Sequence, residues 1–294
     1  MSSHSSNKGA PRVAIAGATG RVGSALISNL LTDPVEIVAL TRSPDAGRVP
    51  PGVSLATVRF EEPSSLSDAL RGADRLFLAH GTSAQQAVNE IALIDAAVAA
   101  GVAHIVKLSV MGPASKLHPF DWHMEIEAHL ARQDIGYTIL RPSSFVDILA
   151  RAGAPVAAGA WGGAAGDGRV NLIDTRDVAD AARVALLDVA HTNSQRAYHL
   201  TGPATVSMAE VAEELSRLLG KTITYQHRTA EEQRDVLIGS GASDLVAGLL
   251  LGIDRLFRES VLAETTATFA DLTGKAPRSV PAWLSENISA FQKP

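Results

Sequence analysis

The chain has 294 residues, 46% of them hydrophobic, a formal net charge of −5 and no cysteine. This size fits one large α/β domain or two small ones, and the negative charge offers no basic surface for a nucleic acid. The lack of cysteine excludes disulfides, thiol catalysis and zinc sites with cysteine ligands, and it is compatible with the reducing cytoplasm in which we expect the protein.

Two segments bear on targeting. Residues 1–11 are polar and carry no apolar stretch, so they predict a disordered leader, or a segment that is not native, rather than a signal peptide. The apolar stretch 245–253 is too short, and too interrupted by glycine, to span a bilayer. We therefore expect no membrane segment.

The segment Val13–Gly23, with the sequence VAIAGATGRVG, joins an apolar run to three glycines and then to a helical pattern. It predicts a strand that ends at Ala16, a phosphate-binding turn and a helix. Gly17 would make the sharp turn, Gly20 would let the backbone approach a phosphate, and Gly23 would let the helix lie close to the sheet. Free backbone N–H groups at the start of the helix would face a pyrophosphate.

A second apolar run, residues 35–40, is followed by Thr41, Arg42 and Ser43. A fold selective for NAD usually places Asp or Glu at this point to bind the ribose hydroxyls. Arg42 is suited instead to the 2′-phosphate of NADPH, because a guanidinium forms charge-assisted hydrogen bonds with phosphate oxygens. The predicted cofactor is therefore NADPH.

Strand-like and helix-like stretches alternate through the first half of the chain, as in a parallel sheet covered on both faces. Further strands are expected at 53–60, 75–80, 104–110 and 137–142, with helices at 84–100 and 122–133, a serine-capped helix at 64–71 and a loop at 44–52. Right-handed crossovers predict the strand order of a dinucleotide-binding fold. His80 and Gly81 follow one strand, near the expected cofactor crevice, although His80 could equally be a structural loop residue.

The second half of the chain predicts a smaller α/β part. The stretch 150–168 is rich in alanine and glycine around Trp161 and too simple to pack as a conventional element, so we expect either a lid over the site or a surface excursion. Strands are expected at 198–201 and 223–226 and helices at 178–187, 207–219, 230–237 and 245–259. Ser207 and Glu210 predict a capping box. The helix at 245–259 could wall the nicotinamide, form a dimer face or lie in the core.

These elements predict an α/β protein with a Rossmann-type doubly wound parallel sheet and a smaller C-terminal α/β substrate-binding part. We expect a dinucleotide-binding region at 12–150 and a substrate and lid region at 151–294, interleaved as one compact unit.

Six motifs occur in a fixed order: GATGRVG at 17–23, KLSVMG at 107–112, WHMEIE at 122–127, YTILRP at 137–142, DTRDVA at 174–179 and LTGP at 200–203. This ordered set resembles the NmrA-like branch of the atypical short-chain dehydrogenases/reductases, which includes NAD(P)H:quinone oxidoreductases. The resemblance covers residues 12–291. It implies an NAD(P)H-dependent reductase of quinones, ketones or related groups, although some relatives bind the nucleotide as sensors without turnover.

The resemblance also implies what this chain lacks. In the wider superfamily a Tyr-x-x-x-Lys pair supplies the proton, whereas here Pro119 stands at the tyrosine position and His123 at the lysine position. No tyrosine lies between Gly23 and Gly136. Ser109 matches the catalytic serine or threonine of the superfamily and could bind a substrate carbonyl, or could merely satisfy the backbone. His123 could contact the nicotinamide ribose, shuttle a proton or be an ordinary helix-surface residue.

The predicted site therefore has two parts. The candidate catalytic residues are Ser109 and His123. The candidate cofactor-binding residues are Gly17, Thr19, Gly20, Arg21, Val22, Gly23, Arg42, Ser43, His80, Gly81, Ser109, Pro142, Ser143 and Phe145. Met111 and Phe145 are expected either to wall the nicotinamide or to pack in the core.

Charged pairs elsewhere have a simpler interpretation. His123 with Glu127, and Glu125 with His129, are spaced for a helical ion pair or a metal site, but no third ligand accompanies them, so we predict no metal. The Arg-Asp dipeptide at 176–177 is expected to form a structural cap and ion pair rather than a catalytic dyad.

Two functions of different classes remain open. The first is an NADPH-dependent reductase that transfers hydride to the carbonyl of a hydrophobic aromatic ketone or quinone, with a polyketide-tailoring ketoreductase of antibiotic biosynthesis favoured. Its proton would come from a neighbouring hydroxyl of the substrate or from water, with Ser109 and His123 only positioning the oxygen. The second is a non-catalytic NADP(H)-binding sensor. Either would be a monomer or homodimer without a nucleic-acid or membrane partner.

Overall fold

The computed structural model describes residues 10–43, 49–113, 118–192 and 194–292. Residues 1–9 of the predicted leader and 44–48 of the predicted loop lie outside this set. Two compact units divide the chain: Met1–Ser109, Trp122–Leu140 and Val178–Tyr198 form the first, and Val110–Asp121, Arg141–Asp177 and His199–Pro294 form the second. The boundary expected after residue 150 is not one of the points at which the chain changes unit.

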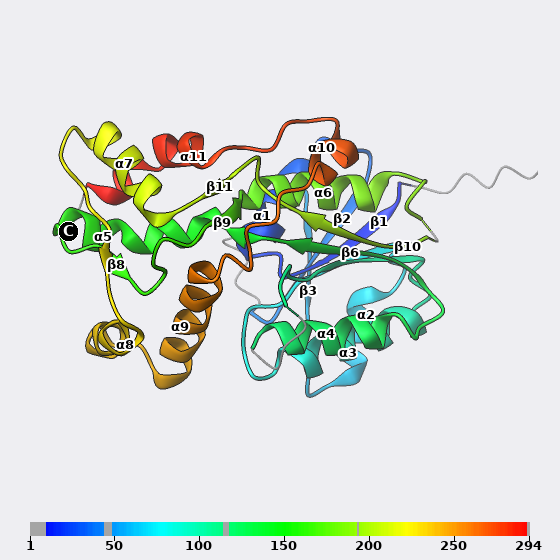
Figure 1. Cartoon of the computed structure of the whole chain (residues 1–294). Helices are drawn as coiled ribbons and strands as arrows, with labels where there is room; N and C mark the ends of the chain where they lie inside the picture. Colours follow the sequence, from blue (N-terminus) through cyan, green and yellow to red (C-terminus); the bar gives the residue numbers. More distant parts are fainter. Residues whose placement is uncertain (1–9, 44–48, 114–117, 193, 293–294) are drawn as a thin grey trace, which may run out of the picture. The chain divides into compact units, whose positions relative to one another are not determined.

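The first unit is built on a seven-stranded sheet with the order β10-β6-β5-β4-β1-β2-β3 (Figure 1). Its strands are β1 (Arg12–Ala16), β2 (Glu36–Thr41), β3 (Ser54–Thr57), β4 (Arg75–Leu78), β5 (His104–Leu108), β6 (Gly136–Pro142) and β10 (Gln195–Leu200). Each neighbouring pair in the series β3-β2-β1-β4-β5-β6 is parallel. The strand order predicted for a dinucleotide-binding fold is confirmed.

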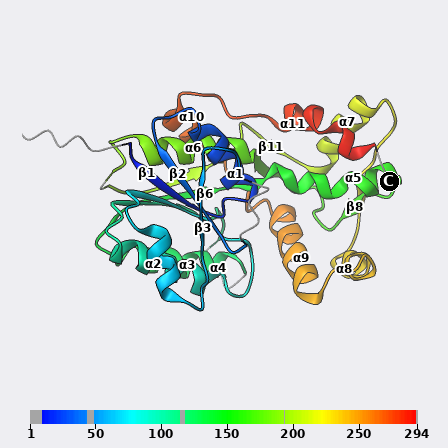
Figure 2. The same ribbon diagram turned by 180° about the vertical axis from the view of Figure 1, so that it is seen from behind.

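Helices cover both faces of this sheet, as Figure 1 and the reverse view in Figure 2 show. The helices α1 (Arg21–Leu30) and α6 (Thr175–Leu187) lie on one face; α2 (Pro63–Leu70), α3 (Gln86–Ala99) and α4 (Phe120–Leu130) lie on the other. Leu66, Ile94 and Ile126 from these three helices share one core cluster with Val38 and Ile105 of the sheet. Because both faces are covered, β1 and β2 are nearly continuous apolar runs, whereas β5 includes His104 and Lys107.

The second unit contains small sheets and further helices. Its strands are β7 (Ser144–Phe145), β8 (Gly162–Gly163), β9 (Val170–Ile173), β11 (Thr205–Val206) and β12 (Gln226–His227), arranged as β11-β9-β7 and β12-β8. Its helices are η2 (Val146–Ala152), α5 (Gly153–Ala157), α7 (Met208–Leu219), α8 (Ala230–Gly239), α9 (Asp244–Arg258), α10 (Thr268–Thr273), α11 (Val280–Glu286) and η3 (Ile288–Phe291). The capping box of Ser207 and Glu210 is confirmed. No helix in the described ranges combines the length and the hydropathy needed to cross a membrane.

Three local predictions are wrong in detail. The helix expected to begin at a serine cap begins instead after Glu62, because Pro63 occupies the first helical position, where its missing N–H would have no partner. The strand expected at 53–60 is reduced to β3, and the one expected at 223–226 shares only its last residue with β12.

The alanine- and glycine-rich stretch 150–168 is not the unpacked loop that its composition predicted. It contains α5 and β8, and Val156, Trp161 and Ala165 are buried in the core of the second unit. Small residues here permit close approach of backbones, since a Cβ atom at Gly153 would lie 2.3 Å from the carbonyl oxygen of Ala290. The simple composition therefore reflects close packing.

Candidate functional site

The turn between β1 and α1 depends on two glycines. Gly17 has a φ of 75°, in the left-handed region, and a Cβ atom there would lie 2.8 Å from the carbonyl oxygen of Ala79. A Cβ atom at Gly23 would lie 2.2 Å from the carbonyl oxygen of Gly17. Gly23 therefore permits a close approach between the first turn of α1 and the preceding turn, whereas the contact predicted from sequence was between the helix and the sheet.

A cavity of about 530 Å³ opens beside this turn, at the carboxyl ends of β1, β2 and β4. Its lining includes these candidate cofactor residues: Gly17, Thr19, Gly20, Arg42, Ser43, His80 and Gly81. The remaining lining residues are Ala16, Leu40, Thr41, Val58, Phe60, Ala79 and Leu93. No carboxylate is among the lining residues that the structure describes.

Thr41 shapes the loop that carries Arg42. Its hydroxyl donates to the Ser43 carbonyl oxygen at 2.8 Å and accepts the Ser43 backbone N–H at 3.1 Å. Arg42 lies exposed at the tip of this small turn, and nothing in the described part of the chain forms a hydrogen bond or ion pair with its guanidinium. The sequence indicated Arg42 but gave no reason to single out Thr41.

Arg21, Val22 and Gly23 occupy the first turn of α1 and do not line the cavity. Gly20 is the N-cap residue and no side chain caps the helix. In an α-helix the N–H groups of the first turn have no partner within the helix. These N–H groups are therefore available to an anion at this helix end.

His80 combines the two roles that the sequence left open. It lines the cavity, and both ring nitrogens are engaged: Nδ1 lies 2.6 Å from the Gly81 carbonyl oxygen and Nε2 lies 3.0 Å from Asn89 Nδ2. Because the amide group of Asn89 donates to Nε2, the ring proton resides on Nδ1. Phe60 packs against the ring edge-on, with the centroids 6.1 Å apart.

Ser109 follows β5 and is buried. Its backbone N–H donates to the Leu140 carbonyl oxygen at 2.7 Å, and its hydroxyl donates to Glu127 Oε1 on α4. Ser109 does not line the cavity beside the glycine turn. The hydroxyl is thus held by a carboxylate, and a role in carbonyl binding stays a prediction.

His123 belongs to a buried polar cluster with Lys107, Glu90 and Gln86. Lys107 Nζ lies 2.7 Å from Glu90 Oε2, and neither side chain has any exposed surface. The same Nζ lies 3.2 Å from His123 Nδ1 and donates to the Leu108 carbonyl oxygen. Gln86 Nε2 lies 3.0 Å from Glu90 Oε1 and 3.2 Å from His123 Nε2.

This cluster disfavours a charged His123 ring. The Lys107 ammonium group at Nδ1 and the Gln86 amide nitrogen at Nε2 are both donors, so neither offers an acceptor to a ring N–H. Burial, and then the charge of Lys107, lower the pKa of His123 to about 2. A proton shuttle works best with a pKa near the working pH, so a pKa this low does not suit a shuttle, and a catalytic role of His123 stays a prediction. The signal for this cluster was a lysine inside the apolar strand 104–110.

The helical pairs expected on α4 have other partners. His129 Nε2 lies 2.6 Å from Asp95 Oδ1, and Glu127 accepts from Ser109. Within the described ranges no group of three His, Asp or Glu side chains could hold a metal.

Other predicted residues belong to the second unit. Ser143 is buried, and its hydroxyl donates to Asn171 Oδ1 at 3.0 Å. Met111 is buried and donates its backbone N–H to the Pro142 carbonyl oxygen at 2.8 Å. Phe145 is half-buried in β7, beside Ile173 of β9. The part of Pro142, Ser143 and Phe145 in cofactor binding stays a prediction.

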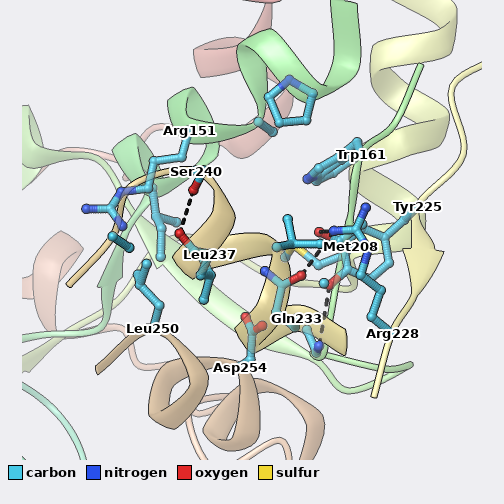
Figure 3. A pocket seen from close by; sticks show the side chains of 18 of the residues that line it. Arg151, Trp161, Met208, Tyr225, Arg228, Gln233, Leu237, Ser240, Leu250 and Asp254 are labelled. Carbon is cyan, nitrogen blue, oxygen red and sulfur yellow. Dashed lines mark hydrogen bonds between the residues drawn. The ribbon is translucent and has the colours of Figure 1, made fainter. Parts of the chain in front are cut away.

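The second unit contains a cavity of about 870 Å³ (Figure 3). The two segments expected to hold the substrate, 150–168 and 245–259, both contribute to its lining. Its larger apolar and aromatic side chains are Trp161, Met208, Tyr225, Leu237, Leu250 and Phe257; its longer polar side chains are Arg151, Arg228, Gln233 and Asp254. Figure 3 shows Trp161, Tyr225 and Arg228 along one side, with Leu237 and Leu250 along the other.

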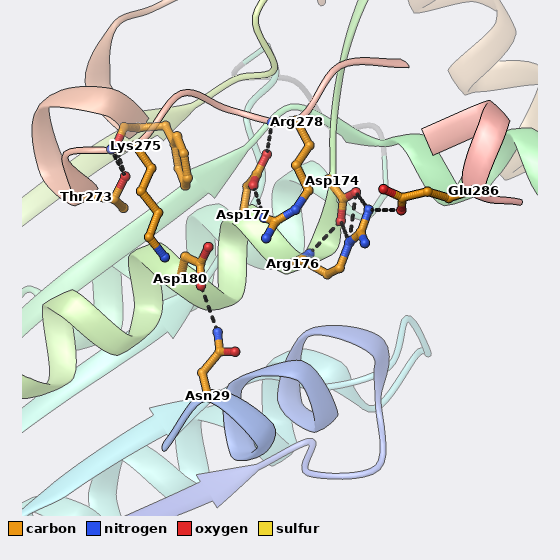
Figure 4. A network of polar contacts seen from close by, with 10 residues as sticks. Asn29, Asp174, Arg176, Asp177, Asp180, Thr273, Lys275, Arg278 and Glu286 are labelled. Carbon is orange, nitrogen blue, oxygen red and sulfur yellow. Dashed lines mark hydrogen bonds and ion pairs between the residues drawn. The ribbon is translucent and has the colours of Figure 1, made fainter. Parts of the chain in front are cut away.

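The dipeptide at 176–177 is structural, as expected (Figure 4). Asp174 accepts the backbone N–H of Arg176 at 2.8 Å and pairs with its guanidinium, which also lies 2.7 Å from Glu286 Oε2. The fully buried carboxylate of Asp177 pairs with Arg278 through the backbone N–H, at 2.8 Å, and the guanidinium. These ion pairs tie the start of α6 to the C-terminal segment of the second unit.

Comparison with known proteins agrees with this arrangement. Residues 17–191 match a family described as NAD(P)H-binding. Quinone oxidoreductase 2 of Escherichia coli (strain K12) is 31% identical over 94% of this chain and 97% of the relative. NAD(P)H azoreductase of Xenophilus azovorans is 30% identical over 95% of this chain and 99% of the relative.

A solved structure supports the same assignment. The NADPH-dependent quinone oxidoreductase from Escherichia coli, complexed with NADPH, matches with a TM-score of 0.86 and 28% identity, over 94% of this chain and 99% of that chain. The chain therefore belongs to the NAD(P)H-binding family, in the NmrA-like, quinone oxidoreductase branch of the atypical short-chain dehydrogenases/reductases, and is an NAD(P)H-dependent oxidoreductase.

Proposed function

We propose that this oxidoreductase prefers NADPH and transfers hydride to the carbonyl of a hydrophobic aromatic ketone or quinone. The observation that carries the proposal is the cavity beside the glycine turn, where, among the residues that the structure describes, Arg42 has no partner and no carboxylate lines the cavity. Arg42 would bind the 2′-phosphate, and the N–H groups of residues 21–23 would bind the pyrophosphate. Bound NADPH would supply the hydride.

The cavity of the second unit supports an aromatic substrate. Its volume of about 870 Å³ falls in the range of small-molecule sites, and its walls are largely apolar. Trp161 and Tyr225 offer aromatic surfaces with ring centroids 5.1 Å apart. These features fit a planar compound with several rings, and we favour aryl ketones of the polyketide type. The related proteins named for quinone and azo reduction are consistent with such a compound.

The proton would come from a hydroxyl of the substrate or from water. Pro119 stands at the position of the usual tyrosine, the Ser109 hydroxyl donates to Glu127, and His123 is neutral. A general acid typically contributes about 10²–10⁴-fold to a rate, so orientation can sustain turnover without one when the carbonyl is already activated. Ser109 and His123 would then position the reacting groups without supplying the proton.

The test is NADPH oxidation in the presence of quinones and hydroxyaryl ketones. We expect turnover of a hydroxyaryl ketone and much slower turnover of its methyl ether, with partial losses in Ser109→Ala and His123→Ala. If either variant abolishes activity while the methyl ether is a good substrate, a side chain supplies the proton. Binding of NADPH without oxidation by any compound would instead support a sensor.

A further inference from the structure

Two polar side chains converge on Gly163 in the wall of the second-unit cavity. A Cβ atom at Gly163 would lie 2.5 Å from the hydroxyl oxygen of Tyr225 and 3.5 Å from Asp254 Oδ2. Both residues line the cavity, and Figure 3 shows them with the other lining side chains. Only a glycine at 163 therefore lets the Tyr225 hydroxyl lie this close to the backbone, next to the Asp254 carboxylate.

Successive backbone N–H groups hold these two side chains. The N–H of Ala164 donates to Asp254 Oδ2 at 3.0 Å, and the N–H of Ala165 donates to the Tyr225 oxygen at 3.4 Å. The Trp161 ring packs edge-on against Tyr225, with an interplanar angle of 75°. The positions of the hydroxyl and the carboxylate are thus set by the protein before any ligand arrives.

Each of the two groups has unused hydrogen-bonding capacity. Within the described part of the chain, the Tyr225 hydroxyl donates to no acceptor, Asp254 Oδ1 accepts from no donor, and no cation lies within 4.0 Å of Asp254. The nearby cations have other partners: Arg228 donates to the carbonyl oxygens of Ala160 and Gly162 and to Gln233, and Arg258 donates to the carbonyl oxygen of Ala164.

The Tyr225 hydroxyl is available here as a hydrogen-bond donor. Burial, and then the charge of Asp254, raise the pKa of Tyr225 to about 12. The hydroxyl therefore keeps its proton at neutral pH. A polar group in an apolar wall contributes mainly specificity, because a ligand that lacks the matching group leaves it unpaired.

We propose that Tyr225 and Asp254 together select an aromatic ligand that carries a carbonyl and a free hydroxyl on the same side of its ring system. The Tyr225 hydroxyl donates to the carbonyl oxygen, and the Asp254 carboxylate accepts from the ligand hydroxyl. The inference rests on the proposed function only in taking this ligand as the substrate. Its binding needs neither NADPH nor turnover.

The test is calorimetric titration of the full chain, without NADPH, with three small probes. 7-Hydroxy-1-tetralone carries both groups, 7-methoxy-1-tetralone lacks the donor, and 5,6,7,8-tetrahydro-2-naphthol lacks the carbonyl. We expect 7-hydroxy-1-tetralone to bind about tenfold more tightly than 7-methoxy-1-tetralone, since a hydrogen bond to a charged group contributes on that scale or above. It should bind roughly threefold to tenfold more tightly than 5,6,7,8-tetrahydro-2-naphthol, which loses a hydrogen bond between neutral groups. This comparison uses the wild-type chain and needs no variant.

Two variants assign the preferences to residues. Tyr225→Phe should abolish the preference for the ketone over the naphthol, and Asp254→Asn should abolish the preference for hydroxyl over methoxy. Tyr198→Phe and Asp271→Asn, at residues that do not line the cavity, should keep both preferences. Equal affinities of the wild-type chain for the three probes, or variants that keep both preferences, would overturn the inference.

The outcomes separate this inference from the proposed function. If the chain shows both binding preferences but no carbonyl compound oxidises NADPH, the proposed function is refuted and the roles of Tyr225 and Asp254 in ligand selection stand. If hydroxyaryl ketones oxidise NADPH but the chain lacks both binding preferences, the roles of Tyr225 and Asp254 in ligand selection are refuted and the proposed function stands.

Discussion

Lys107 Nζ lies 3.2 Å from His123 Nδ1, inside a cluster that also buries the Glu90 carboxylate. Burial, and then the ammonium group, which presents a donor and a positive charge to one ring nitrogen, lower the pKa of His123 and keep the ring neutral. A histidine at this position therefore affects stability in acid, and not only geometry.

His123 should make the folded state lose stability as the pH falls. Its folded pKa of about 2 is far below the unfolded value of roughly 6.5, so only the unfolded chain binds a proton between these limits. The free energy of unfolding should fall by about 1.4 kcal/mol for each pH unit below 6.5. His104, with a pKa lowered to about 4, adds to the effect in every variant that retains it.

Urea unfolding at pH 7.5, 6.5 and 5.5 measures this dependence. His123→Gln should show a shallower loss between pH 6.5 and 5.5 than the wild type. Identical slopes for the wild type and His123→Gln would show that His123 is protonated in the folded protein.

Removing one partner of the buried Lys107–Glu90 pair should be costly. Lys107→Met leaves the Glu90 carboxylate buried without its cation, which typically costs about 3–5 kcal/mol. The double variant Lys107→Met/Glu90→Leu should recover a large part of this loss because no charge remains to be desolvated. Denaturant unfolding of both single variants and the double variant gives the coupling; purely additive losses would contradict it.

Gly23→Ala should destabilise the protein and weaken cofactor binding. The added methyl group would lie 2.2 Å from the Gly17 carbonyl oxygen, so the first turn of α1 must shift, at a cost on the order of 1–3 kcal/mol. Gly248→Ala, in α9 with open space around it, is the matched control and should be neutral or stabilising by about 0.5–1 kcal/mol. Thermal unfolding and calorimetric titration with NADPH measure the two effects. Equal behaviour of the two variants would be inconsistent with the clash.

Arg42→Ala should reduce the affinity for NADPH and leave that for NADH unchanged. A charge-assisted contact with the 2′-phosphate contributes on the order of 1.5–3 kcal/mol, which is more than tenfold in affinity. Arg59→Ala, at an exposed arginine that pairs with Glu62 and does not line the cavity, is the control. Calorimetric titration of both cofactors measures the preference. Equal affinities of the wild-type chain for NADPH and NADH would contradict a role of Arg42 in binding the 2′-phosphate.

The sequence by itself determined the features that depend on residues adjacent in the chain. The apolar run 13–16 and the glycines at 17, 20 and 23 predicted β1, the turn and the start of α1, because turn geometry and close backbone approach impose their requirements locally. The alternation of strands and helices predicted the order β3-β2-β1-β4-β5-β6, since parallel strands need crossover helices of one hand. The capping box joins Ser207 to Glu210, three positions later, and could be predicted from the sequence for the same reason.

Local composition failed where packing decides structure. Alanine and glycine at 150–168 suggested an unpacked loop, yet their small side chains let α5 and β8 lie close to other backbones and bury Trp161. Propensity describes a segment without its neighbours, and burial among them outweighs it.

Only the tertiary structure brought the polar groups together within each unit. Lys107, Glu90 and His123 come from β5, α3 and α4, and Tyr225 and Asp254 meet at Gly163 from separate segments. Whether a polar side chain is solvated, paired or aimed into a cavity depends on which distant elements cover it. The state of a polar side chain therefore depends on packing. Its hydrogen-bond partners and its desolvation are determined by residues that are distant in sequence and close in the fold.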